Sequence, residues 1–469
     1  MLQAKWNRRD FLRLTAGLSA GIAMTACAPA QQPTASTSGE SSEGEAAADP
    51  AATALVFSMW GDLFSVENMR VVLDSYEESN PGVQIEVEHY PFGDYNQKIP
   101  LELAAGAGPD VISTVDLIAP QLIGANRALD LTPYFDILQT EAGKDIGELY
   151  FQSALDIFSR DGKLYAVPYY VDPSIMWVNK GIFETAGLEL PTAEWTWDQF
   201  LDLTKQLTLD DSGNNAASAD FNPDAIVQWG MATHTAYWDS WIKANGTSPW
   251  NEEETASNLL DPRSVEALTL LGQLSWDRVA LSSGMERMVG AEAGYFAFGT
   301  GKVAMCFNAS WLMSYLGEVD PLVQLIPLGP SGEVHGTRLH SGGYTINAAT
   351  ENPDAAFAFA TFFSASEQRL GQAIEVSEAN WGGIPANLEL FESELFQTAG
   401  KGAEINNVFK EALQPASVFS KSTAANELET TVLQLFEEAW NSPEPIDIAP
   451  VIAEADARVT ELLAAASAG

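Results

Sequence analysis

Aromatic and acidic residues follow three predicted strands near the start of the chain, at the points where those strands end. Trp60 and Asp62 follow the first strand, Asp94 and Tyr95 the second, and Asp116 the third. If the strands are parallel, their carboxyl ends meet at one edge of a sheet, where open α/β sheets bind ligands. An aromatic ring can stack on the apolar face of a sugar while carboxylates accept hydrogen bonds from its hydroxyl groups. These residue types therefore favour a binding site for a polyhydroxylated small molecule.

The elements that position this edge alternate between strand and helix. Buried strands are predicted at residues 55–60, 83–87 and 110–114, where apolar residues run together or alternate. Helices are predicted between them at 65–79 and 95–105, and each is followed by a turn rich in Gly and Pro. Strand, helix, strand, helix, strand predicts a parallel sheet with crossover helices, so the fold class is α/β.

The remainder of the chain continues this mixture of strands and helices. A further buried strand is predicted at 303–307 and an extended return segment at 341–347. Helices are predicted at 353–364 and 427–440, and a last helix carries apolar residues at helical spacing between 452 and 462. The body of about 415 residues is long enough for two hydrophobic cores.

The N-terminus carries the features of an export signal. The paired Arg8 and Arg9 precede an apolar stretch at residues 14–26, which is typical of a twin-arginine signal. That stretch is too short to span a bilayer, which needs about 20 apolar residues. We therefore predict a signal peptide at residues 1–26 and an exported protein.

A lipid anchor is predicted at the end of this signal. The sequence Met-Thr-Ala-Cys ending in Cys27 resembles the lipobox of bacterial lipoproteins, whose cysteine receives a diacylglyceryl group and becomes the mature N-terminus. Residues 27–53 contain Ala, Pro, Gln, Ser, Thr, Gly and Glu but no large apolar residue, which predicts a disordered tether. The alternative is an ordinary signal peptide with an incidental cysteine.

Composition and motif searches exclude several function classes. The formal charge of −41 disfavours binding to nucleic acids and to anionic membrane surfaces. The four histidines are scattered without the spacing of metal ligands, and residues 220–224 lack the Gly and Glu of a calcium loop. Residues 299–302 lack the first Gly and the final Ser or Thr of a phosphate-binding loop. We therefore predict no metal and no cofactor.

An ordered series of short motifs identifies a resemblance to a known family. The chain resembles the extracellular solute-binding proteins of bacterial ABC transporters, in particular the carbohydrate binders typified by maltose-binding protein. Each motif is weak alone, but the ordered set is specific. The motifs are Asn80-Pro81-Gly82-Val83, Gly108-Pro109-Asp110-Val111, Asp161 to Pro168, Phe298 to Met305, Gly342-Gly343-Tyr344 and Asn352 to Phe357.

The resemblance implies a two-lobed protein that works by closing on its ligand. The first lobe would hold residues 54–170 and 344–388, and the second would hold residues 171–343 and 389–469. The chain would cross a hinge near 169–172, near 342–344 and after Asn387. Ligand would bridge both lobes, so that binding and closure are coupled, and an ABC permease would read the closed form. A monomer that binds without a covalent step, and hence not an enzyme, is expected.

The resemblance also favours particular residues for the ligand. It places stacking aromatics at Trp60, Trp311 and Trp381 and a polar residue at Asp116. The other candidates are of three kinds. Those at strand ends are Asp62, Asp94, Tyr95 and Asn308, those near the predicted hinge crossings are Tyr170, Asp172 and Gly343, and two further tryptophans are Trp238 and Trp241. The alternative for any tryptophan is a place in the core, and for any aspartate a solvated charge or a helix cap.

Two other functions remain open at this point. An extracellular glycosidase would also combine aromatic residues with a pair of carboxylates in a cleft. A surface receptor that signals rather than transports would bind sugar identically and differ only in its partner. The ligand itself could be a sugar, an oligosaccharide or another small solute such as a polyol or a phosphodiester.

Overall fold

The computed structural model describes residues 53–60, 63–281, 285, 289–290, 296–371, 383–398 and 403–468. The chain divides into two units, Met1–Asp49 and Pro50–Gly469, and the described residues all belong to the second. The predicted signal peptide with Arg8 and Arg9, the lipid attachment site Cys27 and the predicted tether up to residue 52 lie outside the described residues. None of the described helices is both long and apolar enough to cross a membrane.

The first of two large sheets confirms the predicted parallel unit at the start of the body. Strand β1 pairs in parallel with β2 and with β3, and the long strand β13 runs antiparallel between β3 and β6. The strand order is β14, β6, β13, β3, β1, β2, and β15 pairs separately with β13. The strands are β1 (Thr53–Trp60), β2 (Val83–Tyr90), β3 (Val111–Val115), β6 (Ala166–Pro173), β13 (Thr337–Ile346), β14 (Ile384–Pro385) and β15 (Ala416–Ser417).

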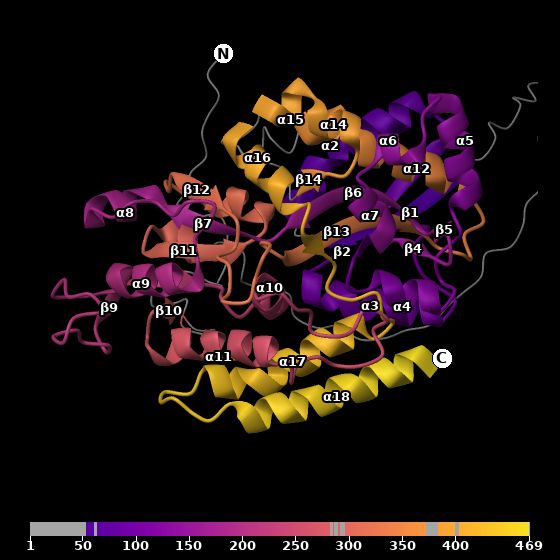
Figure 1. Ribbon diagram of the computed structural model, residues 1–469. Coiled ribbons are helices and arrows are strands. Elements are labelled where there is room, and N and C mark those ends of the chain that lie inside the picture. Colours follow the sequence, from indigo (N-terminus) through magenta and orange to yellow (C-terminus); the bar gives the residue numbers. More distant parts are fainter. Residues whose placement is uncertain are drawn as a thin grey trace, which may run out of the picture. The chain divides into compact units, whose positions relative to one another are not determined.

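Helices cover both faces of the first sheet. In Figure 1, α12 lies above the strands and α3 with α4 lies below them. The aromatic rings of α12 pack on the sheet; for example, Phe359 and Phe363 both meet Phe57 of β1 edge to face. The helices around this sheet are α2 (Leu63–Ser79), α3 (Phe92–Ala104), α4 (Ala119–Gly124), α5 (Thr132–Ala142), α6 (Ile146–Leu149), α7 (Gln152–Ile157) and α12 (Pro353–Ala365). The small hairpin β4 (Ser159–Arg160) and β5 (Lys163–Leu164) precedes β6.

The second sheet is also mixed. Strands β9 and β11 are parallel, whereas β7 runs antiparallel to β11 and to β12. The strand order is β10, β9, β11, β7, β12, and β8 pairs separately with β9. The strands are β7 (Ile175–Asn179), β8 (Leu209–Asp210), β9 (Ile226–Ala232), β10 (Ala280–Leu281), β11 (Val303–Asn308) and β12 (Pro321–Gln324).

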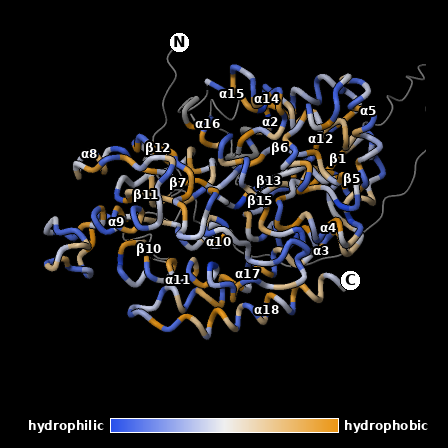
Figure 2. Tube along the Cα trace, viewed as in Figure 1, coloured by the Kyte–Doolittle hydropathy of each residue, from blue (hydrophilic) through white to orange (hydrophobic). Residues whose placement is uncertain are grey.

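The C-terminal helices pack on the second sheet's helical layer. Helix α11 contacts α17, and α17 contacts α18, so that the three form the stack seen at the bottom of Figure 1. Ile452, Ala455 and Val459 of α18 are fully buried at helical spacing, and hydrophobic and hydrophilic residues alternate along this helix in Figure 2. The helices around the second sheet are α8 (Lys180–Ala186), α9 (Trp197–Leu207), α10 (Trp238–Ala244), α11 (Pro262–Trp276), α17 (Ala425–Trp440) and α18 (Ala449–Ala468). Of the three helices that precede α17, α14 (Leu388–Glu392) contacts β14 and α6 of the first sheet, α15 (Glu394–Thr398) contacts α14 and α16, and α16 (Ala403–Ala412) contacts β6 and β12.

Strands β6 and β13 lead the chain from one sheet to the other. Ser174 alone separates β6 of the first sheet from β7 of the second. Its amide donates to the carbonyl of Arg338, and its own carbonyl accepts from the hydroxyl of Thr337. The predicted lobe boundaries after residues 170 and 343 fall inside β6 and β13, and they stay a prediction.

A buried group of charges lies where these segments meet. The guanidinium of Arg338, on β13, pairs with Asp239 of α10 at 2.7 Å and with Glu429 of α17 at 2.5 Å. Lys243, one turn after Asp239, pairs with the same carboxylate at 2.9 Å. Burial alone would raise the pKa of Asp239, but the positive charges of Arg338 and Lys243 lower it to about 2.

This ion cluster, which comprises Arg338, Asp239, Lys243 and Glu429, also holds the segment that leads into α17. The ammonium group of Lys243 donates to the carbonyls of Ser417 and Val418 at 2.9 and 3.2 Å. The guanidinium of Arg338 lies 4.2 Å from the ring centre of Phe419. The cluster therefore ties β13, α10, α17 and β15 together through charges that are shielded from water.

Removing one charge of this cluster should destabilise the protein strongly. Arg338→Met deletes the cation and leaves Asp239 and Glu429 without it, and breaking a buried ion pair in this way costs about 3–5 kcal/mol. We expect a loss of that size in the free energy of unfolding at pH 7, measured by urea denaturation. Arg458→Met, which removes an exposed pair with Glu461 on α18, is the matched control and should change little. Equal effects of the two substitutions would contradict this role of the cluster.

Candidate ligand-binding site

The two sheets are joined by the carboxylate of Asp172, one of the predicted site residues. It lies near the end of β6 and accepts hydrogen bonds from the amide of Ser310, at 2.9 and 3.0 Å, and from its hydroxyl, at 2.8 Å. Ser310 begins the short 3-10 helix Ser310–Tyr315 that follows β11 of the second sheet. Burial raises the pKa of Asp172 to about 7, although the hydrogen bonds from Ser310 oppose the rise.

An aromatic group lies beside this junction and holds Trp311. The rings of Tyr237 and His340 meet Trp311 edge to face, with centres 6.2 and 5.2 Å away. The hydroxyl of Tyr237 donates to Oδ1 of Asn308 at 3.3 Å, so that the last residue of β11 is fixed to the same group. Trp311 itself remains partly exposed, whereas Asn308 is buried. The structure thus brings together two predicted residues, Asn308 and Trp311.

Asp116 carries an unsatisfied acceptor at the carboxyl end of β3. Its amide donates to the carbonyl of Ser341 on β13 at 3.1 Å, and its Oδ1 accepts a long bond of 3.4 Å from the amide of Ser341. Its Oδ2 is buried without a hydrogen-bond partner among the described residues. Burial raises the pKa of Asp116 to about 7, and the charge of Arg338 limits the rise. An acceptor in this state can take a hydrogen bond from a ligand's hydroxyl group.

A bulge at Tyr169 of β6, opposite the glycines of β13, lies next to Asp116 and involves Tyr170 and Gly343. The register between β13 and β6 shifts between Gly342 and Gly343, and the hydroxyl of Ser341 donates to the carbonyl of Tyr170 at 2.7 Å. A Cβ atom on Gly342 would lie 2.2 Å from the ring of Tyr170, so only glycine permits this approach. Gly343 faces inward, where a Cβ atom would lie 2.8 Å from that of Ala166.

Strand pairing joins these groups into one candidate site. His340 is the register partner of Asp172, and Gly342 is the partner of both Tyr170 and Val115, the residue before Asp116. The candidate site therefore comprises Asp116, Tyr170, Asp172, Asn308, Trp311 and Gly343, which were predicted from the sequence, and Tyr237, Ser310, His340 and Ser341, which were not.

The other predicted residues of the first sheet form a separate aromatic group. Trp60, at the end of β1, meets Phe92 and Tyr95 edge to face at 5.6 and 5.7 Å. The hydroxyl of Tyr95 lies 2.9 and 2.8 Å from the carbonyls of Ser58 and Ser113, and its side chain is fully buried. Tyr95 therefore supports the strands from within the core. Asp94, beside it, is exposed in the first turn of α3.

Four predicted residues have no described place in the site. Trp238 and Trp241 are fully buried in the core of the second sheet, where they pack on Phe419 and on Phe307. Their burial is that of core residues, so we leave both out of the proposed site. Asp62 and Trp381 lie outside the described residues.

No local sequence pattern marked the site residues that the sequence analysis missed. Tyr237 and His340 reach Trp311 from a loop and a strand that are about 70 and 30 residues away along the chain, which a single sequence does not show. Burial and the charge of Arg338 lower the pKa of His340, so its imidazole is neutral and can bond to the hydroxyl of Ser174, 3.1 Å from Nε2.

Among the described residues, no three His, Cys, Asp or Glu side chains are placed to hold a metal ion.

Known proteins share this fold at low sequence identity. An ABC substrate-binding protein from Listeria monocytogenes, solved in complex with cycloalternan, superposes with a TM-score of 0.73 at 22% identity, covering 87% of this chain and 98% of that one. The GacH receptor of Streptomyces glaucescens, solved without ligand and with acarbose, gives a TM-score of 0.68 at 19% identity, covering 88% and 98%. These likenesses confirm the two-lobed α/β fold.

The sequence comparisons place the chain in a family. An arabinooligosaccharide-binding protein of Halalkalibacterium halodurans is 20% identical over 342 residues, which is 69% of each chain. Residues 65–369 match the sequence profile of the family described as bacterial extracellular solute-binding protein, whose members bind solutes rather than transform them. That match contains every residue of the candidate site and all strands of the two sheets except β1, β14 and β15. The chain therefore belongs to the bacterial extracellular solute-binding proteins.

Proposed function

We propose that this protein is the substrate-binding component of an ABC import system and that it binds a sugar or an oligosaccharide between its two lobes. The observation that carries the proposal is the candidate site itself. It combines the partly exposed ring of Trp311 with the unsatisfied Oδ2 of Asp116, and it draws these groups from both sheets. A ring that stacks on an apolar sugar face and an acceptor for a hydroxyl are the two groups that sugar recognition needs.

The comparisons support a carbohydrate over the other solutes. Relatives carry names such as arabinooligosaccharide-binding and mannitol-binding protein, and the structural neighbours include proteins solved with cycloalternan and with acarbose. Another relative, 24% identical over 32% of this chain, is named for sn-glycerol-3-phosphate. The buried carboxyl groups of Asp116 and Asp172 would repel a phosphate, so a neutral polyhydroxylated ligand fits this site better.

We further propose that binding closes a hinge. The expected crossings near 169–172 and near 342–344 would lie in β6, just before Ser174, and in β13, and the third, expected after Asn387, would lie in the segment from Ala416 to Phe419. A ligand held by Asp116 from one sheet and by Trp311 from the other stabilises the closed state only when both contacts are made. The closed monomer would then deliver its ligand to the membrane permease, and no covalent step is involved.

The stacking role of Trp311 can be tested by mutation. A thermal-shift screen with arabinotriose, maltotriose and mannotriose identifies a ligand, because a ligand that binds only the folded state raises the melting temperature. Trp311→Ala should then weaken that ligand's affinity by about 30-fold or more, since a central aromatic anchor contributes about 2 kcal/mol or more. Calorimetry measures the affinity.

The control for this test is Trp276→Phe. Trp276 packs between α11 and α17, where its indole donates to the carbonyl of Ala439 at 3.1 Å, and it takes no part in the candidate site. This substitution should leave the affinity unchanged. Wild-type affinity in Trp311→Ala, or recovery of cleaved oligosaccharide, would refute the proposed role.

The proposal also predicts how affinity depends on pH. In the free protein, burial holds the pKa of Asp116 near 7, whereas an ionised carboxylate is the better acceptor for a sugar hydroxyl. Affinity for the sugar should therefore rise as the pH increases from 6 to 8. In Asp116→Asn the part of this rise that comes from ionisation of Asp116 should disappear. Asp94→Asn, at an exposed carboxylate, is the matched control.

The free protein provides an independent check on that pKa. A carboxyl group whose pKa is raised by folding contributes stability below its unfolded pKa, near 4, and this contribution is lost as the pH rises through 7. Asp116→Asn should therefore reduce the fall in unfolding free energy between pH 4 and pH 8. An unchanged pH profile of both affinity and stability would contradict the assignment.

We propose that the protein is exported through its twin-arginine signal and anchored by lipid on Cys27. The family is extracellular, and the tether would hold the binding domain at high local concentration beside its permease. Cys27→Ser should move the protein from the membrane fraction to the soluble fraction of its host. Cys306→Ser is the matched control, because Cys306 is buried in β11 beside the hydroxyl of Thr233. If both variants remain at the membrane, the lipid anchor on Cys27 is ruled out.

A further inference from the structure

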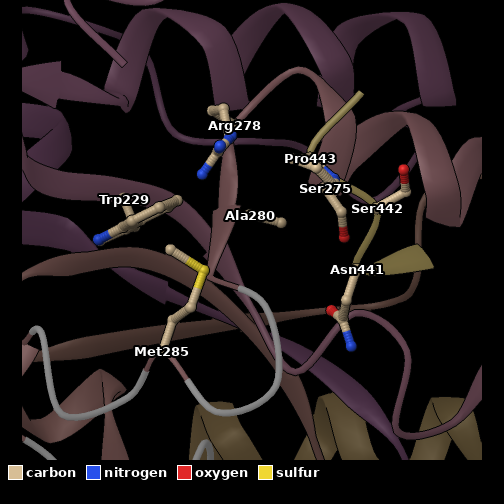
Figure 3. Close-up of a pocket in the computed structure, with 8 residues that line it drawn as sticks. All are labelled: Trp229, Ser275, Arg278, Ala280, Met285, Asn441, Ser442 and Pro443. Atoms are coloured by element: carbon tan, nitrogen blue, oxygen red, sulfur yellow. The ribbon is translucent and has the colours of Figure 1, made fainter. Parts of the chain in front are cut away.

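A cavity lies beside the second sheet, away from the candidate sugar site. It has a volume of about 250 Å³ and is lined on one side by Trp229 and Met285 and on the other by Ser275, Asn441 and Pro443. Figure 3 shows the side chain of Arg278 directed into the space between these two sides. The cavity therefore has one apolar side, one side that carries hydroxyl and amide groups, and one cation.

This cavity is separate from the candidate sugar site because it lies at the other end of the sheet. Trp229 of β9 is the register partner of Val303, the first residue of β11, whereas Asn308 of the candidate site is the last residue of that strand. Five residues of extended strand span about 16 Å. A ligand in the cavity would therefore not touch Asn308 or Trp311.

The charge of Arg278 is not neutralised within the described part of the chain. Most described arginines and lysines form an ion pair, as Arg70 does with Asp74 and Lys205 does with Asp277. No described ion pair or side-chain hydrogen bond includes Arg278, and the described residues that line the cavity include no acid. In a chain with 64 acids and 23 bases, this is an unusual setting for a cation.

The backbone of Arg278 adds an independent observation. Its φ angle is +55°, in the left-handed region that favours glycine. It stands directly after the last turn of α11, where the amide of Arg278 donates to the carbonyl of Ser275 and that of Val279 to the carbonyl of Leu274. This hydrogen-bond pattern normally carries glycine at the position of Arg278. The negative end of the helix dipole favours a cation here, but it does not account for the strained backbone or for the cavity.

A neighbouring histidine is hydrogen-bonded to Ser275. Nε2 of His234 lies 2.9 Å from the hydroxyl oxygen of Ser275, and burial lowers the pKa of His234 to about 3, so the imidazole is neutral. In the tautomer that carries the proton on Nε2, His234 donates to Ser275 and the serine hydroxyl is left to donate into the cavity; in the other tautomer the hydroxyl donates to Nε2. In the first tautomer, Arg278 and Ser275 offer donors to the same ligand.

We propose that this cavity binds a small organic carboxylate. A guanidinium binds a carboxylate through paired hydrogen bonds, and Ser275 would supply another donor. Trp229, Met285 and Pro443 would contact the apolar part of the ligand. The volume corresponds to about eight water molecules at ~30 Å³ each, enough for a compact ring with one carboxyl group.

Benzoate and its neutral analogue benzamide provide the test. Benzoate should raise the melting temperature of the purified protein in a saturable manner, and benzamide should have little effect. Arg278→Gln should abolish the benzoate response. Arg127→Gln removes an arginine of the first lobe whose described hydrogen bond is to the carbonyl of Ala104, and it should keep the full response. Equal responses to the two compounds, or an unchanged response in Arg278→Gln, would overturn the proposal.

Arg278→Gly separates a binding role from a structural one. Glycine relieves the left-handed conformation, so this variant should melt at a higher temperature than the wild type while losing its benzoate response. A lower melting temperature would show that the arginine is retained for stability and would overturn the proposal. The benzoate response should persist in Trp311→Ala. A failure of the proposed sugar site would therefore leave the benzoate test unaffected, and a failure of the benzoate test would leave the sugar site unaffected.

Discussion

Arg338 is a cation held out of water, and its charge must be balanced by groups that the fold brings to it. Desolvating a charge costs several kcal/mol unless partners of opposite charge are placed within ion-pair distance. Asp239 and Glu429 meet this requirement from helices α10 and α17, and Lys243 extends the cluster to the backbone of β15. Helices α10 and α17 are distant from β13 in the sequence. They pack around the start of this strand so that each of the four charges of the cluster has a partner of opposite sign.

The candidate site depends on this arrangement because it is built on the next residues of the same strand. His340, Ser341 and the two glycines follow Arg338 along β13, and they carry the contacts to Asp172, Asp116 and Tyr170. The charge of Arg338 also acts on Asp116 directly, since it limits the rise in that residue's pKa. A single strand thus connects the buried ion cluster to the groups that would bind a ligand, and a movement of β13 would alter both.

The parts of this molecule that local patterns determine were predictable from the sequence. Strands β1 to β3 and helices α2 and α3 follow from apolar periodicity and turn residues, and the position of Asp116 at a strand end follows from them. The family motifs located Trp311 after β11. By contrast, Trp238 and Trp241 could not be separated from site tryptophans, because every residue of α10 is buried and the helix has no exposed face to reveal its orientation. The ion cluster joins residues about 100 positions apart, and such pairings are decided by tertiary packing.

The central claim is that a sugar bridges the two lobes and closes them. Small-angle X-ray scattering of the purified protein, with and without a saturating oligosaccharide found by the thermal-shift screen, measures this most directly. The account predicts a smaller radius of gyration with the sugar, no change for Trp311→Ala at the same sugar concentration, and recovery of the sugar intact. An unchanged radius of gyration in the saturated wild-type protein would contradict the account.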